Sequence, residues 1–198
     1  MQTINKTVEL YSFKELPPEG QAKAIQNRQE SEEWWGGDEC TASLKAFCTR
    51  VGINLRNWSL GYRSDIRWEF DACNSFRWSE DWYRNQDTGN DGSHMKGVRL
   101  WKWLMNDNWT YSAKDILEAA DGSCPLTGMW SDCPLFDAFA RFIKKPDNST
   151  TFDDLLQEAK SDFESACNKD YEYCFSEEAA REMLENSDDE FTADGERY

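Results

Sequence analysis

Residues 151–166 read TFDDLLQEAKSDFESA, and this stretch decides the character of the second half of the chain. Its apolar side chains recur every three or four residues, which is the spacing of one face of an α-helix. The members of this stripe are Phe152, Leu155, Leu156, Ala159, Phe163 and Ala166. Similar stripes within 98–105, 112–122, 132–143 and 176–184 predict further helices, so we expect the second half to be mainly helical.

The first half contains the signals for β-structure. Residues 66–72 alternate apolar and polar side chains, which is the period of a strand. Residues 53–62 predict a second strand, and a change of apolar phase in its middle predicts a bulge near Arg56 and Asn57. The short connection at 62–65 predicts that the two strands pair antiparallel.

Together these elements predict an α+β fold in which a small antiparallel sheet is covered by several helices. We expect a single domain over 1–198, with a mixed helix and strand part at 1–105 and an acidic helical part at 106–198. The remaining predicted elements are a short strand at 8–13, a surface helix from 18 to about 35 and a helix at 40–51. We expect the core to contain Trp68, Phe70, Leu135, Phe139, Leu155 and Phe163.

The composition is that of an acidic, aromatic-rich protein. The chain has 198 residues, of which 38 are acidic and 22 are basic, and its net charge is −16. An aromatic content of 14% argues against the disorder that such a charge often brings, because buried rings supply large apolar areas. No apolar run approaches the roughly 20 residues of a membrane-spanning helix, and the first residues do not resemble a signal peptide. We therefore expect a cytoplasmic location.

The excess charge lies in the second half. Residues 1–50, 51–105 and 106–198 carry net charges of −2, +1 and −15. A charge polarised in this way attracts a basic protein surface and repels nucleic acid. We therefore expect a protein or complex with a basic surface as the partner and no membrane contact. Direct binding of nucleic acid is disfavoured. The alternative is an acidic surface that only keeps the protein in solution.

The candidate partner-binding residues are carboxylates on the last two predicted helices and just after them: Asp153, Asp154, Glu158, Asp162, Glu178, Glu182, Asp188 and Asp189. Carboxylates on a helix repeat at neighbour distances of about 5–6 Å, comparable with the repeat of phosphates along a strand. This repeat suggests that the acidic face imitates DNA. Since Asp154, Glu158 and Asp162 flank the apolar stripe, we expect their reversal to Lys to leave the fold intact.

An alternative binding surface lies in the segment 63–84, where arginines alternate with aromatic residues. Its candidates are Arg67, Arg77, Trp78, Trp82 and Arg84. Such pairs stack on nucleic-acid bases or form energetic centres of protein interfaces. The segment therefore suggests a direct nucleic-acid binder as a competing function, while a structural role for its rings remains open.

The sequence supports no specific catalytic chemistry. It has no glycine-rich phosphate-binding motif, and no nucleophile motif accompanies its single histidine, His94. Asp87, Asn90 and Asp91 lack the spacing of a calcium-binding loop. Seven cysteines without a C-x-x-C pair predict free thiols. We expect no catalytic residue, no metal and no cofactor; a metal-dependent hydrolase or nuclease that uses carboxylates is the alternative.

The two ends of the chain resemble small proteins encoded by bacteriophages and other mobile elements. The head Tyr11-Ser12-Phe13-Lys14-Glu15-Leu16 is similar to their Y-x-F-x-E-L opening, and the tail Glu190-Phe191-Thr192-Ala193-Asp194-Gly195 to their E-F-T-x-D-G ending. These motifs contain no catalytic residue. The resemblance implies a phage accessory protein, a group that includes anti-CRISPR and anti-restriction inhibitors. Our hypothesis is a non-enzymatic protein that blocks a nucleic-acid-handling defence complex of the host.

Overall fold

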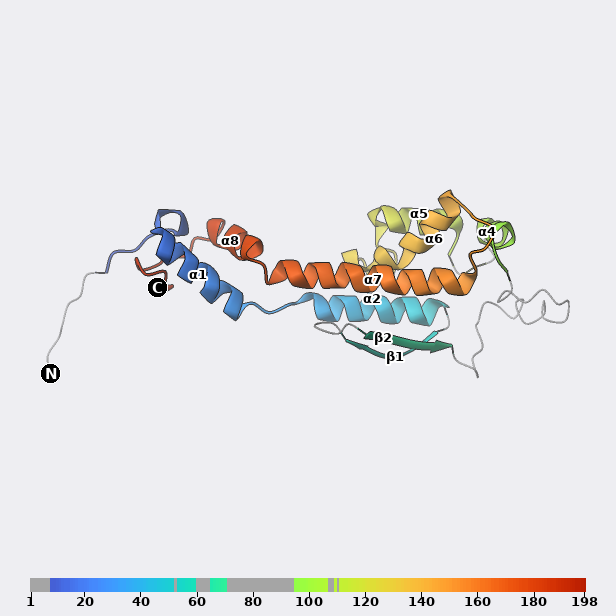
Figure 1. Cartoon of the computed structure of the whole chain (residues 1–198), viewed down its shortest axis with the longest axis horizontal. Coiled ribbons are helices and arrows are strands. Elements are labelled where there is room, and N and C mark those ends of the chain that lie inside the picture. Colours follow the sequence, from blue (N-terminus) through green and yellow to red (C-terminus); the bar gives the residue numbers. More distant parts are fainter. Residues whose placement is uncertain (1–7, 52, 60–64, 71–94, 107–108, 110) are drawn as a thin grey trace. The chain divides into compact units, whose positions relative to one another are not determined.

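The computed structural model divides the chain into two compact units. Unit 1 combines the two ends of the chain, Met1–Trp34 and Asp170–Tyr198, and unit 2 is Trp35–Lys169. The structure describes residues 8–51, 53–59, 65–70, 95–106, 109 and 111–198 (Figure 1). That residues 1–198 behave as one domain stays a prediction.

Helices dominate the described residues, so the fold is α-rich. The helices are α1 (Pro18–Ser31), α2 (Gly36–Val51), α4 (Val98–Met105), α5 (Ala113–Glu118), α6 (Pro134–Lys144), α7 (Phe152–Cys174) and α8 (Glu177–Glu185). Shorter helical turns are η1 (Phe13–Glu15), η4 (Ala119–Ser123) and η5 (Trp130–Asp132), and the strands are β1 (Ile53–Ser59) and β2 (Asp65–Phe70). The expected helices of the second half are confirmed.

Unit 2 is built around the part of α7 that it contains. In Figure 1 this part runs between α2 on one side and α6 on the other. Ring contacts join the layers: Phe139 of α6 lies 5.4 Å from Phe152 of α7, and both pack on Trp109. The predicted core residues of α6 and α7, namely Leu135, Phe139, Leu155 and Phe163, are all buried, so this part of the core prediction is confirmed.

The two strands form a hairpin against α2. They pair antiparallel, and their register shifts between Leu55 and Asn57, where the bulge is expected. Trp58 links β1 to α2, because its indole Nε1 donates a hydrogen bond to Oγ1 of Thr41 over 2.9 Å. Within the described residues this hairpin is the whole of the sheet, and a sheet covered by several helices stays a prediction. The side chains of Trp68 and Phe70 lie outside the description.

Unit 1 packs α1 against α8 and the C-terminal tail. Its core consists of Phe13, Leu16, Ala24, Ile25, Ala180, Leu184 and Phe191. The helix α1 therefore contributes to a core, and it ends at Ser31 rather than near residue 35. The strand expected at 8–13 is wrong: only Tyr11 bridges to Phe191, and η1 follows at once. An alternating stretch forms a strand only where a neighbouring strand accepts and donates its backbone hydrogen bonds. Among the described residues, the tail pairs with this stretch at one residue only, Phe191.

The C-terminal tail folds into a tight turn. Phe191 bridges to Arg197, and the N–H of Thr192 donates a hydrogen bond to the carbonyl oxygen of Glu196 over 2.9 Å. Gly195 has a positive φ of 84°, and a β-carbon there would collide with the carbonyl oxygen of Gly20 on α1. Glycine is therefore required at this position both for its conformation and for the close approach of the tail to α1.

Candidate partner-binding site

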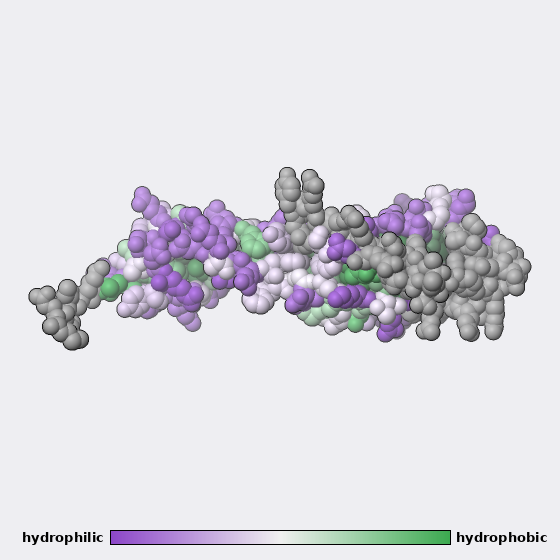
Figure 2. All heavy atoms as spheres, turned by 90° about the horizontal axis from the view of Figure 1, so that it is seen from below, coloured by the Kyte–Doolittle hydropathy of each residue, from purple (hydrophilic) through white to green (hydrophobic). Residues whose placement is uncertain are grey.

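Unit 1 carries most of the excess charge. It contains 17 acidic and 6 basic residues, a net charge of −11, while unit 2 contains 21 and 16, a net charge of −5. On the face seen in Figure 2, hydrophilic residues cover much of the surface that unit 1 contributes. The smaller unit is therefore the stronger source of negative field.

The predicted site residues at the start of α7 belong to unit 2, and Asp154 has a structural role there. Its Oδ2 accepts hydrogen bonds from the backbone N–H and the hydroxyl of Thr151, at 2.8 and 2.7 Å. The hydroxyl of Thr151 accepts one in return from the N–H of Asp154. These bonds form a capping box at the start of the helix. They also hold the pKa of the Asp154 carboxyl below its ordinary value.

Two further predicted residues of α7 are paired with a cation. Nη2 of Arg141 on α6 lies 3.2 Å from Oε2 of Glu158 and 2.8 Å from Oδ2 of Asp162. Asp153 is exposed in the first turn of α7. Reversing Asp154, Glu158 and Asp162 to Lys would therefore remove the cap that Asp154 forms and place two lysines beside Arg141. The expectation that this reversal leaves the fold intact conflicts with these contacts.

The predicted residues of α8 belong to unit 1 and are differently placed. Glu178, Glu182 and also Glu185, which is not among the predicted site residues, follow the i, i+4, i+7 spacing of one helix face, and all three are exposed. The basic residue of the helix, Arg181, is paired with Glu177, since Nη2 lies 3.2 Å from Oε1. We call Glu178, Glu182 and Glu185 the α8 face.

Tyr173, near the end of α7, borders the α8 face. Its hydroxyl donates a hydrogen bond to Oε2 of Glu182 over 2.8 Å. This hydrogen bond, followed by the charge of Glu182, raises the pKa of the tyrosine. The hydrogen bond and the charge of Glu182 both favour the neutral, protonated form of the tyrosine.

The last two predicted residues follow α8. Asp188 is exposed. Oδ1 of Asp189 lies 2.6 Å from Nη2 of Arg197, so this carboxylate is compensated within the tail. The predicted acidic residues thus fall into two groups on different units, and the α8 face is the group with the least internal compensation.

A buried carboxylate that the sequence analysis missed lies in unit 2. Asp132 is fully buried, and its oxygens accept hydrogen bonds from the N–H groups of Leu126, Thr127 and Gly128 at 2.9, 2.7 and 3.2 Å. The hydroxyl of Ser43 on α2 donates a further hydrogen bond over 2.5 Å. Because the carboxylate is enclosed and satisfied by these donors, its role is to hold the 126–128 turn against α2.

The alternative surface cannot be assembled from the described residues. Arg67 lies on β2, but its side chain is outside the description, as are Arg77, Trp78, Trp82, Arg84 and His94. Its role therefore stays a prediction.

The described cysteines are free thiols. Sγ of Cys40 lies 3.1 Å from Sγ of Cys167 between α2 and α7, and both residues are buried. Burial also raises the pKa of the Cys48 thiol to about 12. In the described part of the chain, no three His, Cys, Asp or Glu side chains gather in a way that could hold a metal ion.

No protein-family model, curated protein or solved structure matches the chain. Among the described helices, none combines the length and the apolar character that crossing a membrane requires.

Proposed function

We propose that this chain is a non-enzymatic protein that binds a basic surface of a host protein through unit 1. One observation carries the proposal. The α8 face exposes three carboxylates on one side of a helix, and the helix's own cation is already occupied by Glu177. An exposed face of uncompensated charge attracts a surface of opposite sign and discriminates against acidic partners.

The spacing of the carboxylates supports a more specific partner class. Side chains at i and i+4 on a helix lie about 5–6 Å apart, a repeat comparable with that of phosphates along a nucleic-acid strand. We therefore extend the proposal to a basic groove that normally holds nucleic acid and that the α8 face occupies instead. The resemblance of the chain ends to phage accessory proteins supports a host defence complex as this partner and the host cytoplasm as the location.

The first test is capture from a nuclease-treated bacterial lysate, with the bound proteins identified by mass spectrometry. The test variant is Glu178→Lys/Glu182→Lys. The matched control, Glu33→Lys/Asp121→Lys, makes the same change of net charge at exposed residues elsewhere. We expect a specific partner to bind the wild type and the control but not the test variant.

Competition separates the general proposal from DNA imitation. Duplex DNA should displace the captured partner if the α8 face occupies a nucleic-acid groove. Capture that persists with the test variant contradicts the proposed function. Capture that is lost with the test variant but resists competing DNA supports the basic partner and contradicts imitation.

A further inference from the structure

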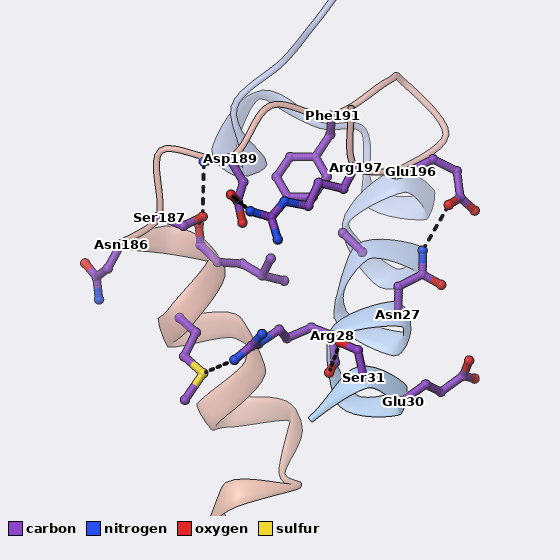
Figure 3. Close-up of a pocket in the computed structure, with 14 residues that line it drawn as sticks. Asn27, Arg28, Glu30, Ser31, Asn186, Ser187, Asp189, Phe191, Glu196 and Arg197 are labelled. Carbon is purple, nitrogen blue, oxygen red and sulfur yellow. Dashed lines mark hydrogen bonds and ion pairs between the residues drawn. The ribbon is translucent and has the colours of Figure 1, made fainter. Parts of the chain in front are cut away.

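A groove in unit 1 lies on a different side of α8 from the α8 face. Its volume is about 890 Å³, and its walls come from α1, the end of α8 and the C-terminal tail (Figure 3). Sites for ligands typically enclose roughly 300–1,000 Å³, so the groove is large enough for a few residues of a peptide.

The groove opens onto the core of unit 1. Ala24, Leu184 and Phe191 line it, and each is at most 5% exposed. Met183 adds a flexible apolar wall and is 44% exposed. An apolar side chain placed here would extend the existing core, and methionine adapts readily to occupants of different shape.

The charged residues around the groove leave a negative excess. Arg197 is paired with Asp189, and Nη2 of Arg28 lies 2.5 Å from Oε2 of Glu32. Two further lining carboxylates receive hydrogen bonds from neutral amides. Glu30 accepts from Gln26 over 2.8 Å, and Glu196 accepts from Asn27 over 3.4 Å. These two carboxylates, in a unit of net charge −11, favour a cationic occupant.

Arg28 spans the groove and makes a weak contact there, which a bound ligand could replace with a stronger one. Its Nη2 lies 3.2 Å from Sδ of Met183, and a thioether is a weak acceptor. Its Nε is buried without a hydrogen-bond partner in the part of the chain that the structure describes. A peptide carbonyl would be a better acceptor for this guanidinium than the sulfur it now contacts.

We infer that this groove is the docking site for a short segment of the protein partner, one that carries an apolar side chain flanked by Lys or Arg. The apolar side chain packs against Leu184, Phe191 and Met183. The basic residues pair with Glu30 and Glu196. The inference rests on the proposed function for its basic partner, but it assigns a separate surface.

The test uses the full chain labelled with ¹³C at its methionine methyl groups. The chain has five methionines, so the spectrum is simple, and Met183→Leu assigns the signal of interest. The probe is a synthetic eight-residue peptide with two central leucines and two Lys or Arg residues on each side. One control peptide replaces the basic residues by Glu, and another replaces the leucines by Ser.

We expect the basic leucine peptide to shift the Met183 signal in a saturable way, while Met105 and Met129 stay unchanged. Neither control peptide should produce this shift. Glu30→Lys/Glu196→Lys should weaken binding by about tenfold or more, because two exposed ion pairs are each replaced by repulsion. Glu33→Lys/Asp121→Lys makes the same charge change at exposed residues outside the groove and should retain the shift.

Three results would overturn the inference: a Met183 signal that no peptide moves, an equal shift with the glutamate peptide, or an equal shift with the serine peptide. Circular dichroism of each variant verifies that it is folded. The proposed function is judged separately by partner capture with the α8-face variant. If no peptide shifts the Met183 signal but partner capture still depends on the charge of the α8 face, the docking inference is wrong and the proposed function stands.

Discussion

The hydroxyl of Tyr173 and Oε2 of Glu182 are 2.8 Å apart, which joins the end of α7 to the α8 face. Ionising the tyrosine would break this hydrogen bond and place a phenolate beside a carboxylate, so the pKa of Tyr173 is raised. We expect Tyr173 to titrate above the ordinary value of about 10, and Glu182→Gln to lower its pKa toward that value. Ring-labelled tyrosine NMR measures both. Identical titration in the two proteins would contradict the described contact.

The tail should depend on Gly195 for its position in unit 1. Gly195 and Gly128 share a φ of 84°, but only at Gly195 would a β-carbon collide with another part of the chain. Gly128→Ala should cost roughly 1–2 kcal/mol of stability for its conformation. Gly195→Ala should cost more, because it adds the collision with the Gly20 carbonyl. Denaturant titration compares the two, and equal costs would remove the proposed close approach.

Asp132→Asn should destabilise unit 2. An amide would point N–H groups at backbone donors that now reach a carboxylate, and hydrogen bonds to charged groups contribute about 1.5–3 kcal/mol each. Asp137→Asn is the matched control. Burial, and then the charge of Asp162, raises the pKa of Asp137, so its charge opposes folding and its removal should cost nothing at neutral pH. The midpoints of urea unfolding compare the stability of the two variants with that of the wild type. An unchanged midpoint for Asp132→Asn would contradict the assigned role.

The loop before α7 should give an acid-dependent contribution through Asp147. Hydrogen bonds from Thr150 and Ser149 lower the pKa of Asp147 to about 2. Because the pKa is lowered on folding, the contribution to stability is present above the unfolded value of about 3.9 and is lost as the pH falls through about 2. Asp147→Asn should therefore lower the melting temperature at pH 5 but not near pH 2. A difference that stays constant over this range would disprove the linkage.

The sequence predicts the parts of the fold that local periodicity controls. The stripes of α6, α7 and α8 and the bulged hairpin are examples, because each follows from the order of apolar residues within one segment. Contacts between distant segments have no such local signal. Ser43 reaches Asp132 across 89 residues, and α1 packs on α8 at the other end of the chain. The division into two compact units and the groove depend on such contacts, for which local periodicity carries no signal.

The candidate site shows the same limit. The sequence shows which residues are acidic, but it does not show which of these carboxylates are paired with a nearby cation. Arg141 neutralises Glu158 and Asp162 from a different helix, whereas Glu178 and Glu182 lie on a helix whose cation is held by Glu177. Only the structure separates these two groups, and it makes the α8 face a stronger candidate binding site than the acidic residues of α7.

The most direct test of the central claim is the affinity of the captured partner as a function of salt, measured for the wild type and for Glu178→Lys/Glu182→Lys. Screening shortens to about 8 Å at physiological ionic strength and to about 3 Å at 1 M. Binding through the α8 face should therefore weaken steadily as salt rises, and the variant should bind at least about tenfold more weakly at low salt. An affinity that changes neither with salt nor with the charge reversal would contradict the account.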